Sequence, residues 1–401
     1  MKPLNVGMIG AGMRSAVYLR HIPKELTPRV RLVALADPQQ TQRATFLEVV
    51  GRGSDRPRMY ECGADLLAAE ELDGLVIGTP NDQHVIDAVP AIRRRIPLAL
   101  EKPVAIKLDD CAQLWRAYVE AGRPPVVVGF VLRYTPFYSR VREMIRSGTL
   151  GQVLTVTADE NLDIGLTNFF LRSDWRRWDR RSGGFMIEKC CHDMDILNWL
   201  IGGRVERVNS TARRTHLVSN PPGGRLPRLD ADAPADPRID YGDQSLSTLI
   251  SQRYFGSLYD TSDDLPDHQA VTLEYDNGVL ATFNAVFAQP YCTRRVKVFA
   301  ANGYVEGDIR RSQLIHEHFD DAGRPATTQI SIAHDKSGHH GGDTNTVDNF
   351  WRCVAGEPVE IRAGLEAGIE AVVVATAAEQ SKRVGQPVDV APLRQRAFSM
   401  F

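Results

Sequence analysis

Short apolar runs alternate with segments of helical spacing along the first third of the chain. Continuous apolar runs predict strands that are buried on both faces, and their alternation with helices predicts a doubly wound parallel sheet over residues 1–130. The predicted strands are Leu4–Ile9, Val30–Ala36, Gly74–Gly78, Leu98–Leu100 and Pro125–Phe130. The predicted helices are Met13–Leu26, one that ends near Ile92, and Asp109–Ala121.

After Gly151 the strand-like segments follow one another, which predicts an α+β domain over residues 131–401 with a large open, mostly antiparallel sheet. Its predicted strands are Val153–Asp159, Val205–Thr211, Gln269–Tyr275, Val279–Phe287, Arg294–Ala300 and Tyr304–Ile309. Asp276-Asn277-Gly278 is a hairpin turn signal between two of them. Helices are expected near Asp343–Ala355 and Gly364–Val384, and the helix at 364–384 is expected to pack back on the first domain.

A polar segment at 213–267 is rich in Pro, Asp and Ser. It is too long for an ordinary connection, so it predicts an insertion that acts as a lid or linker or lacks order.

Composition limits the classes of function. The chain has 401 residues, which favours two or three domains, and its formal net charge of -2 argues against a sequence-independent nucleic-acid binder. No apolar stretch approaches the roughly 20 residues that span a bilayer. Six cysteines without a Cys-x-x-Cys pair indicate reduced thiols, so we expect a cytoplasmic protein with neither nucleic acid nor membrane as a partner.

A glycine turn follows the first predicted strand and opens the first helix. Gly10 and Gly12 permit a tight turn near a pyrophosphate, and Met13 and Arg14 begin the helix whose N-terminus attracts anions. Ser15 stands where the third glycine of the pattern is usual. Asp37 ends the second predicted strand, where an acid binds ribose hydroxyls, so the pattern predicts a Rossmann domain that prefers NAD to NADP. The alternatives are a turn without a ligand and a helix cap at Asp37.

Two further turns follow predicted strands. Thr79-Pro80-Asn81 and Glu101-Lys102-Pro103 stand at carboxyl ends of the parallel sheet, the edge at which such sheets bind ligands. By itself, the second triplet is only a turn, and an exposed lysine before a proline is usually just solvated.

Glu188, His192 and Asp195 are spaced i, i+4 and i+7, so on a helix they share one face. Such a row predicts a histidine that is oriented by a carboxylate and exchanges protons. Taken alone, the row is more typical of a helix N-terminus that favours acids, with a structural histidine in the core. A zinc site is the third interpretation, but the usual His-x-x-x-His or cysteine-rich pattern is missing, so no metal is predicted.

Together these motifs resemble the glucose–fructose oxidoreductase/inositol 2-dehydrogenase/rhizopine-catabolism (Gfo/Idh/MocA) family. The resemblance runs through Gly10–Ser15, Thr79-Pro80-Asn81 with His84, Glu101-Lys102-Pro103, Gly129–Tyr134, Gly183-Gly184, and Glu188, His192 and Asp195. It implies that Lys102 and His192 flank the substrate carbinol and that Glu188 stands where many members have Asp. It also implies oligomerisation through the open sheet, as a homodimer or homotetramer.

The expected site has three groups of residues. Lys102, His192, Asp195 and Glu188 are expected in catalysis. Cofactor binding is expected from Gly10, Gly12, Met13, Arg14, Asp37, Thr79, Pro80, Asn81, His84, Glu101, Lys102 and Arg133. Substrate binding is expected from Lys102, Tyr134, Trp175, Arg176, Glu188, His192 and His340.

The leading hypothesis is therefore an NAD(P)-dependent dehydrogenase acting on a secondary alcohol of a sugar, a sugar derivative or an inositol-like cyclic polyol. Two alternatives stay open. One is a redox-neutral, NAD-dependent glycosidase or an enzyme that forms a 3-keto-glycoside. The other is a non-catalytic regulator that senses NAD and a sugar.

Overall fold

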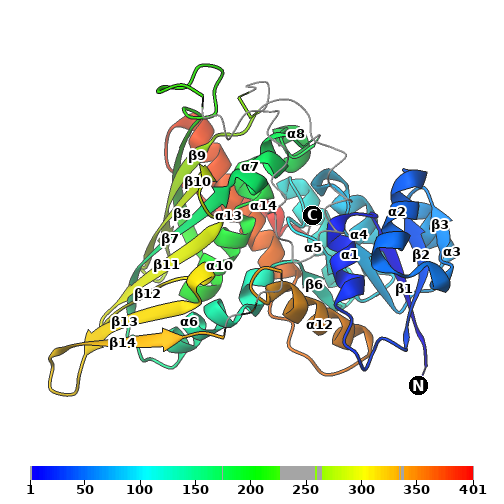
Figure 1. The fold of residues 1–401 in the computed structure, drawn as a ribbon, viewed down its shortest axis with the longest axis horizontal. Helices are drawn as coiled ribbons and strands as arrows, with labels where there is room; N and C mark the ends of the chain where they lie inside the picture. The colour runs from blue at the N-terminus through cyan, green and yellow to red at the C-terminus, as the bar shows by residue number, and fades with distance from the viewer. Residues whose placement is uncertain are drawn as a thin grey trace.

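Two sheets lie on opposite sides of a layer of helices (Figure 1). The computed structural model describes residues 2–173, 175–225, 258–259, 264–333, 335 and 338–400. Most of the polar segment predicted at 213–267 therefore lies outside the described residues. The two sheets confirm the predicted fold class.

The first sheet is parallel and has the strand order β3-β2-β1-β4-β5-β6. This order reverses at β1, so the carboxyl ends of β1 and β4 border the crevice in which such folds bind ligands. Its strands are β1 (Leu4–Ile9), β2 (Val30–Ala36), β3 (Arg58–Tyr60), β4 (Gly74–Ile77), β5 (Leu98–Leu100) and β6 (Val126–Val128). Its helices are α1 (Met13–Arg20), α2 (Gln40–Val50), α3 (Gly63–Ala69), α4 (His84–Arg93) and α5 (Leu108–Glu120).

The expected elements of this domain differ from the structure at two places. α1 ends at Arg20 rather than near residue 26, because Pro23 lacks the N–H that a helix would need there. α2, β3 and α3 were not predicted. β3 has only three residues, none of them buried, so it carries no apolar run.

The second sheet has nine strands in the order β14-β13-β12-β11-β7-β10-β9-β8-β15. Among the strands in the described residues of this sheet, only β7 and β10 pair in parallel. Gly278, at a φ of 83°, closes the predicted hairpin between β9 and β10. The strands are β7 (Val153–Asp163), β8 (Val205–Arg213), β9 (His268–Tyr275), β10 (Leu280–Gln289), β11 (Thr293–Ala300), β12 (Gly303–Asp308), β13 (Gln313–Phe319), β14 (Pro325–Ser331) and β15 (Val388–Asp389).

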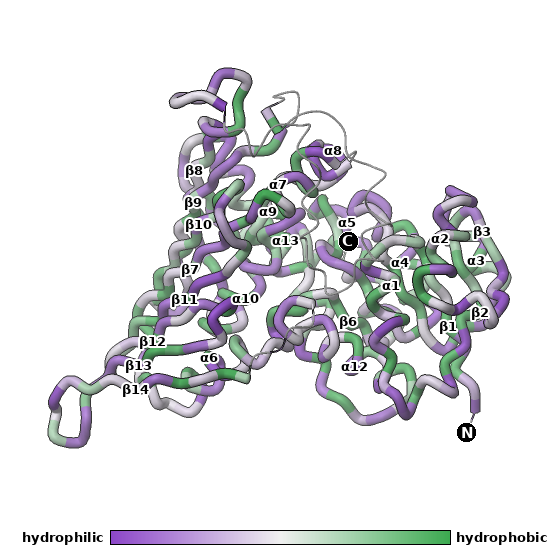
Figure 2. Tube along the Cα trace, viewed as in Figure 1, coloured by the Kyte–Doolittle hydropathy of each residue, from purple (hydrophilic) through white to green (hydrophobic). Residues whose placement is uncertain are grey.

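Hydrophobic and hydrophilic residues alternate along these strands, as the changes between green and purple in Figure 2 show. The apolar face packs against helices that lie between the two sheets (Figure 1). β14 was not predicted because it is polar and mostly exposed at the sheet edge. The helices after β6 are α6 (Pro136–Arg146), α7 (Ile164–Leu171), α8 (Asp179–Ser182), α9 (Phe185–Glu188), α10 (Cys191–Ile201), α12 (Gly342–Val354), α13 (Leu365–Val384) and α14 (Ala391–Ala397).

Helices α12 and α13 return to the first domain from the last third of the chain. The Trp351 indole N–H donates a hydrogen bond of 2.8 Å to the carbonyl of Tyr18 on α1. Phe350 packs edge-on against the Tyr18 ring. On α13, a Cβ added at Gly368 would lie 2.5 Å from Val104, after β5, and 3.3 Å from Val128 on β6, so glycine permits the close contact of this helix with the first domain. The first domain is therefore covered in part by late elements.

Candidate active site

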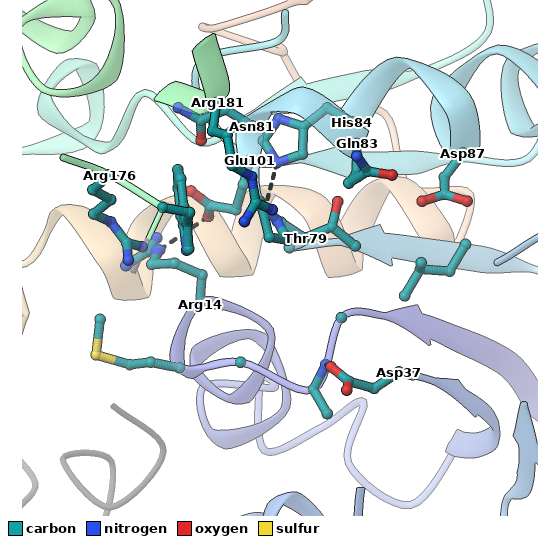
Figure 3. Close-up of a pocket in the computed structure, with 18 of the residues that line it drawn as sticks. Arg14, Asp37, Thr79, Asn81, Gln83, His84, Asp87, Glu101, Arg176 and Arg181 are labelled. Carbon is teal, nitrogen blue, oxygen red and sulfur yellow. Dashed lines mark hydrogen bonds and ion pairs between the residues drawn. The ribbon is translucent and has the colours of Figure 1, made fainter. Parts of the chain in front are cut away.

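A cavity of about 680 Å³ lies between the two domains. It runs along the carboxyl ends of β1, β2, β4 and β5 and is closed from the other side by α7, the segment before α8, and α10. Figure 3 shows that Asp37 and Arg176 stand toward opposite ends of the drawn residues, with Arg14, Thr79 and Glu101 between them. One continuous space therefore joins the glycine turn to the second domain.

The glycine turn is shaped for close approach by a ligand. Gly10 has a φ of 92°, and a Cβ there would lie 2.7 Å from the carbonyl oxygen of Gly78. Gly12 caps α1 without a side-chain hydrogen bond, and Met13 and Arg14 line the cavity beside it. A helix start without a capping side chain fits an anionic pyrophosphate, so these residues fit a dinucleotide.

Ser15 departs from the usual glycine pattern, and the neighbouring strand compensates for it. A Cβ added at Gly78, after β4, would lie 2.5 Å from the Ser15 hydroxyl oxygen. The glycine that allows close packing of helix and sheet is therefore on the facing strand rather than on the helix.

Asp37 lies at the end of β2 and borders the cavity. One carboxylate oxygen accepts a hydrogen bond of 3.0 Å from the Ala11 N–H, and the other accepts one of 2.9 Å from the Gln39 N–H. The carboxylate is therefore held beside the glycine turn. Its two oxygens are the atoms that would bind a ribose and also the atoms that would cap a local turn in the alternative interpretation.

His84 joins the two turns that follow β4 and β5. Its Nδ1 lies 2.7 Å from the carbonyl oxygen of Pro103, and its Nε2 lies 3.0 Å from that of Thr79. Burial lowers the pKa of His84, and a neutral ring donates to only one of these acceptors at a time. His84 thus positions the turn that carries Lys102.

Lys102 extends from the end of β5 across the cavity toward the second domain. Its Nζ donates a hydrogen bond of 2.7 Å to the backbone carbonyl of Glu188. An ammonium group has three donors, so two stay available for a ligand in the cavity.

Glu188 binds residues from both domains with its carboxylate. Oε1 accepts a hydrogen bond of 3.0 Å from Arg176, and Oε2 accepts one from the Asn81 side chain. Because both oxygens are bound and the side chain is 4% exposed, this carboxylate is a link between the domains.

His192 lies on α10, and the expected helical row is wrong in its geometry. α9 ends at Glu188 and α10 begins at Cys191, so Glu188 and His192 are on separate helices. Within the described residues, the Nδ1 atom of His192 has no hydrogen-bond partner. Burial, followed by the charges of Lys102 and Arg294, lowers the pKa of His192 well below its usual value. His192 is therefore a neutral base that no carboxylate orients.

Asp195 does not orient the histidine, which corrects the expected catalytic role. Its two oxygens accept hydrogen bonds of 2.6 and 2.8 Å from Arg133. Neither residue is among those that line the cavity, and the Arg133 guanidinium is bound to Asp195 instead. Arg133 also donates to the carbonyl of Arg362, which ties the segment before α13 to α10.

Two expected substrate contacts are likewise displaced from the cavity. The Tyr134 hydroxyl donates to Asn349 at 3.1 Å and accepts from the Arg362 N–H at 3.1 Å, so it anchors α12. His340 does not line the cavity, whereas its neighbour His339 does.

Trp175 and Arg176 lie in the cavity wall as expected. The Arg176 guanidinium lies 4.1 Å from the centre of the Trp175 ring and 4.0 Å from that of Phe169 on α7. Phe169 and Phe170 were not predicted, although the apolar run of α7 was a signal for a buried wall.

A chain of charges that the sequence did not reveal lies at the domain boundary. Arg14 donates to Glu101 at 3.0 Å and to Asp343 at 2.8 Å, and Asp343 also contacts His339 at 2.9 Å. Asp343 was expected at the start of a helix, and nothing in the local sequence indicated that a residue so distant contacts Arg14.

A second cluster of charges is buried near His192. Glu160 contacts Lys189 at 2.8 Å and Arg294 at 2.6 Å, and Arg294 contacts Asp193 at 2.8 Å. Glu160, Cys190 and Asp193 bring three ligand-type atoms within 4.8 Å of one another. Because both carboxylates are bound to these cations, the arrangement is that of a buried ion-pair network.

The fold and the cavity together define a class of protein, an oxidoreductase with a dinucleotide-binding first domain and a second domain that completes the cavity wall. Residues 4–130 match the family described as "Oxidoreductase family, NAD-binding Rossmann fold", and residues 142–390 match its "C-terminal alpha/beta domain". The chain belongs to the Gfo/Idh/MocA family of oxidoreductases, as the resemblance predicted.

Relatives within the family differ in how much of the chain they match. YteT of Bacillus subtilis is 21% identical over 98% of this chain and 99% of its own length. Inositol 2-dehydrogenase of Rubrobacter xylanophilus is 30% identical, but the alignment covers 51% of this chain and 54% of that relative. A levoglucosan dehydrogenase solved with NADH and levoglucosan shares the fold, with a TM-score of 0.72, 18% identity, and coverage of 97% of this chain and 100% of that one.

None of the helices in the described part of the chain combines the length and apolar character that crossing a membrane requires.

Replacement of Asp195 by asparagine is expected to lower the free energy of unfolding by about 3 kcal/mol, because it leaves Arg133 without its charge partner in a buried setting. Urea denaturation measures the change. Asp348→Asn is the matched control, since Asp348 pairs with Arg352 at the surface and the loss there is expected to stay below about 1 kcal/mol. Equal stability of Asp195→Asn and the unaltered protein would contradict a structural ion pair.

Proposed function

We propose that this protein is an NAD-dependent dehydrogenase that oxidises a secondary alcohol of a sugar, a sugar derivative or an inositol-like cyclic polyol. The observation that carries the proposal is that Lys102 and His192 border the same cavity as Gly10, Gly12 and Asp37. A donor and a neutral base thus stand at the end of a site that fits a dinucleotide. The names of the relatives, inositol 2-dehydrogenase and levoglucosan dehydrogenase, support a cyclic polyol or sugar.

NAD is proposed over NADP because of Asp37. Its carboxylate is held beside the Ala11 N–H, where the hydroxyls of an adenosine ribose would be bound. A 2′-phosphate would bring negative charge next to this carboxylate, which disfavours NADP.

The proposed chemistry divides between Lys102 and His192. Bound NAD would supply the acceptor for the hydride. Lys102 donates a hydrogen bond to the carbinol oxygen and stabilises its alkoxide character. His192, which is neutral, accepts the hydroxyl proton. Glu188 and Asn81 hold the two domains together, and Thr79, Pro80, His84 and Glu101 shape the turns at the cofactor.

Aromatic side chains support a sugar or cyclic polyol as the substrate. Phe169, Phe170 and Trp175 border the cavity at the end that the second domain forms. Aromatic faces suit the C–H faces of a ring, and the guanidinium of Arg176 beside them suits hydroxyl groups.

The outer face of the open sheet is proposed as the surface of a homodimer or homotetramer. Leu154, Leu280 and Phe299 are exposed, and the register places Leu280 and Phe299 on either side of Thr155. The six free cysteines fit a reducing compartment, which we propose to be the cytoplasm.

The proposal is tested by incubating the protein with NAD and a panel of sugars, glycosides, amino sugars and inositols. Growth of NADH absorbance with at least one member is expected, and no NADH with any of them would overturn it. Cleavage of a glycoside without net NADH would instead support the redox-neutral alternative. Binding of NAD and a sugar without any turnover would support the regulator.

Asp37→Ala is expected to weaken NAD binding by about 10-fold, since a charge-assisted hydrogen bond contributes roughly 1.5–3 kcal/mol, and to reduce the preference over NADP. Dissociation constants of both nucleotides can be measured by fluorescence titration. Asp73→Asn serves as a control, because Asp73 lies outside the cavity and contacts Lys2. NAD affinity that is unaffected by Asp37→Ala would remove this residue from the ribose site.

Lys102→Met and His192→Gln are each expected to lower kcat by about 100-fold or more.

Oxidation needs a neutral His192 ring. Because the pKa of His192 is lowered well below its usual value of 6.5, the ring stays neutral as the pH drops below 6.5. In the pH profile of kcat/KM for oxidation, the midpoint of the acid limb is therefore expected to lie below pH 6.5. An acid limb at or above this pH would show that another group accepts the proton, and near-normal kcat in either variant would exclude its residue from catalysis.

A further inference from the structure

His339 faces His192 across the cavity, and it comes from the segment just before α12. The centres of the two rings are 6.2 Å apart. Both rings border the cavity, but the His339 side chain is 29% exposed whereas His192 is buried. His339 therefore reaches solvent, whereas its neighbour His192 does not.

Asp343 fixes the orientation of His339. The Nδ1 atom of His339 lies 2.9 Å from one oxygen of Asp343, and Arg14 donates to the other oxygen at 2.8 Å. Although burial raises it, the pKa of Asp343 is held far below its usual value by Arg14 and His339, so this carboxylate stays charged. A proton on Nδ1 that is donated to a carboxylate leaves Nε2 as the basic nitrogen of the ring.

In the His339–Asp343 pair, a carboxylate orients a histidine, which is the arrangement that the sequence predicted for His192. His192 has no partner for Nδ1 among the described residues and lies near three cations, Lys102, Lys189 and Arg294. A proton that His192 accepts from a substrate is therefore unstable there and has to be passed on. His339 is the imidazole ring that neighbours it, and the separation of the rings suits one bridging water molecule rather than a direct hydrogen bond.

We propose that His339, positioned by Asp343, is a second acid–base group of this site that carries the substrate proton from His192 to solvent. The inference rests on the proposed dehydrogenase function. As the alcohol C–H bond breaks, its hydride reduces NAD, the oxidant of the proposed reaction, and the C–O bond becomes C=O. The hydroxyl proton goes to His192, then through water to Nε2 of His339, and is released to solvent.

Charged and titratable groups from several elements surround the pair. Asp343 contributes from α12, Arg14 and Tyr18 from α1, and Glu101 from the turn after β5. Lys102, Lys189 and Arg294 act on His192, and Asp335 lies beside Gly341. Among these groups, only Asp343 is within hydrogen-bond distance of His339 in the described structure, so it alone is assigned the positioning role.

The first test is kinetic, with a substrate that the NAD-reduction panel provides. His339→Gln is expected to lower kcat for oxidation about 10-fold or more, with KM and NAD affinity changed less than about 3-fold. Added imidazole is expected to restore turnover, because a small base replaces the missing proton carrier. His318→Gln, on β13, is the matched control and is expected to keep kcat unchanged.

The second test separates positioning from folding. Asp343→Asn is expected to lower kcat, and the double variant with His339→Gln to lower it no further, because both changes act through one ring. Unchanged kcat in His339→Gln, a loss that imidazole does not rescue, or additive losses in the double variant would each overturn the inference. A panel in which the unaltered protein reduces no NAD would remove the proposed function, and this inference with it. If the unaltered protein reduces NAD and the His339→Gln variant does so at the same rate, the inference about His339 is overturned but the proposed function is not.

Discussion

The organisation of the site depends on one buried carboxylate, that of Glu188. Its oxygens bind Asn81 of the first domain and Arg176 of the second, while its backbone carbonyl accepts from Lys102. These contacts hold the turn after β5 and the aromatic wall before α8 in place relative to each other. Burial of the Glu188 charge costs free energy of desolvation, and the hydrogen bonds from the Arg176 guanidinium and the Asn81 amide offset this cost.

The fold could be predicted from local pattern to a large extent. Continuous apolar runs such as β4 and β5 identify strands buried on both faces, and the alternation in β9 and β10 identifies a sheet with one covered face. Elements that bury little apolar surface, such as β3 and β14, carry no such pattern and were missed. The helix break between Glu188 and Cys191 was missed because the helical spacing of polar residues continues across it.

The candidate site was best predictable in its parts that follow strands. Gly10, Asp37 and Lys102 border the cavity because the edge of a parallel sheet collects the residues after its strands. Asp195 was misassigned because spacing on a helix does not show that Arg133, 62 residues earlier, binds both of its oxygens. The contact of His339 with Asp343 is local, but the bond from Asp343 to Arg14 spans 329 residues, and no local pattern encodes it.

The packing of α12 on α1 has a consequence for synthesis of the chain. Tyr18 lies in the first domain, but the residues that cover it, Phe350 and Trp351, leave the ribosome more than 300 residues later. At roughly 5–20 residues per second, the face of α1 stays uncovered for about 15 to 60 seconds. The nascent cofactor domain therefore presents an apolar surface for this interval, and such a surface favours aggregation until the last third of the chain covers it.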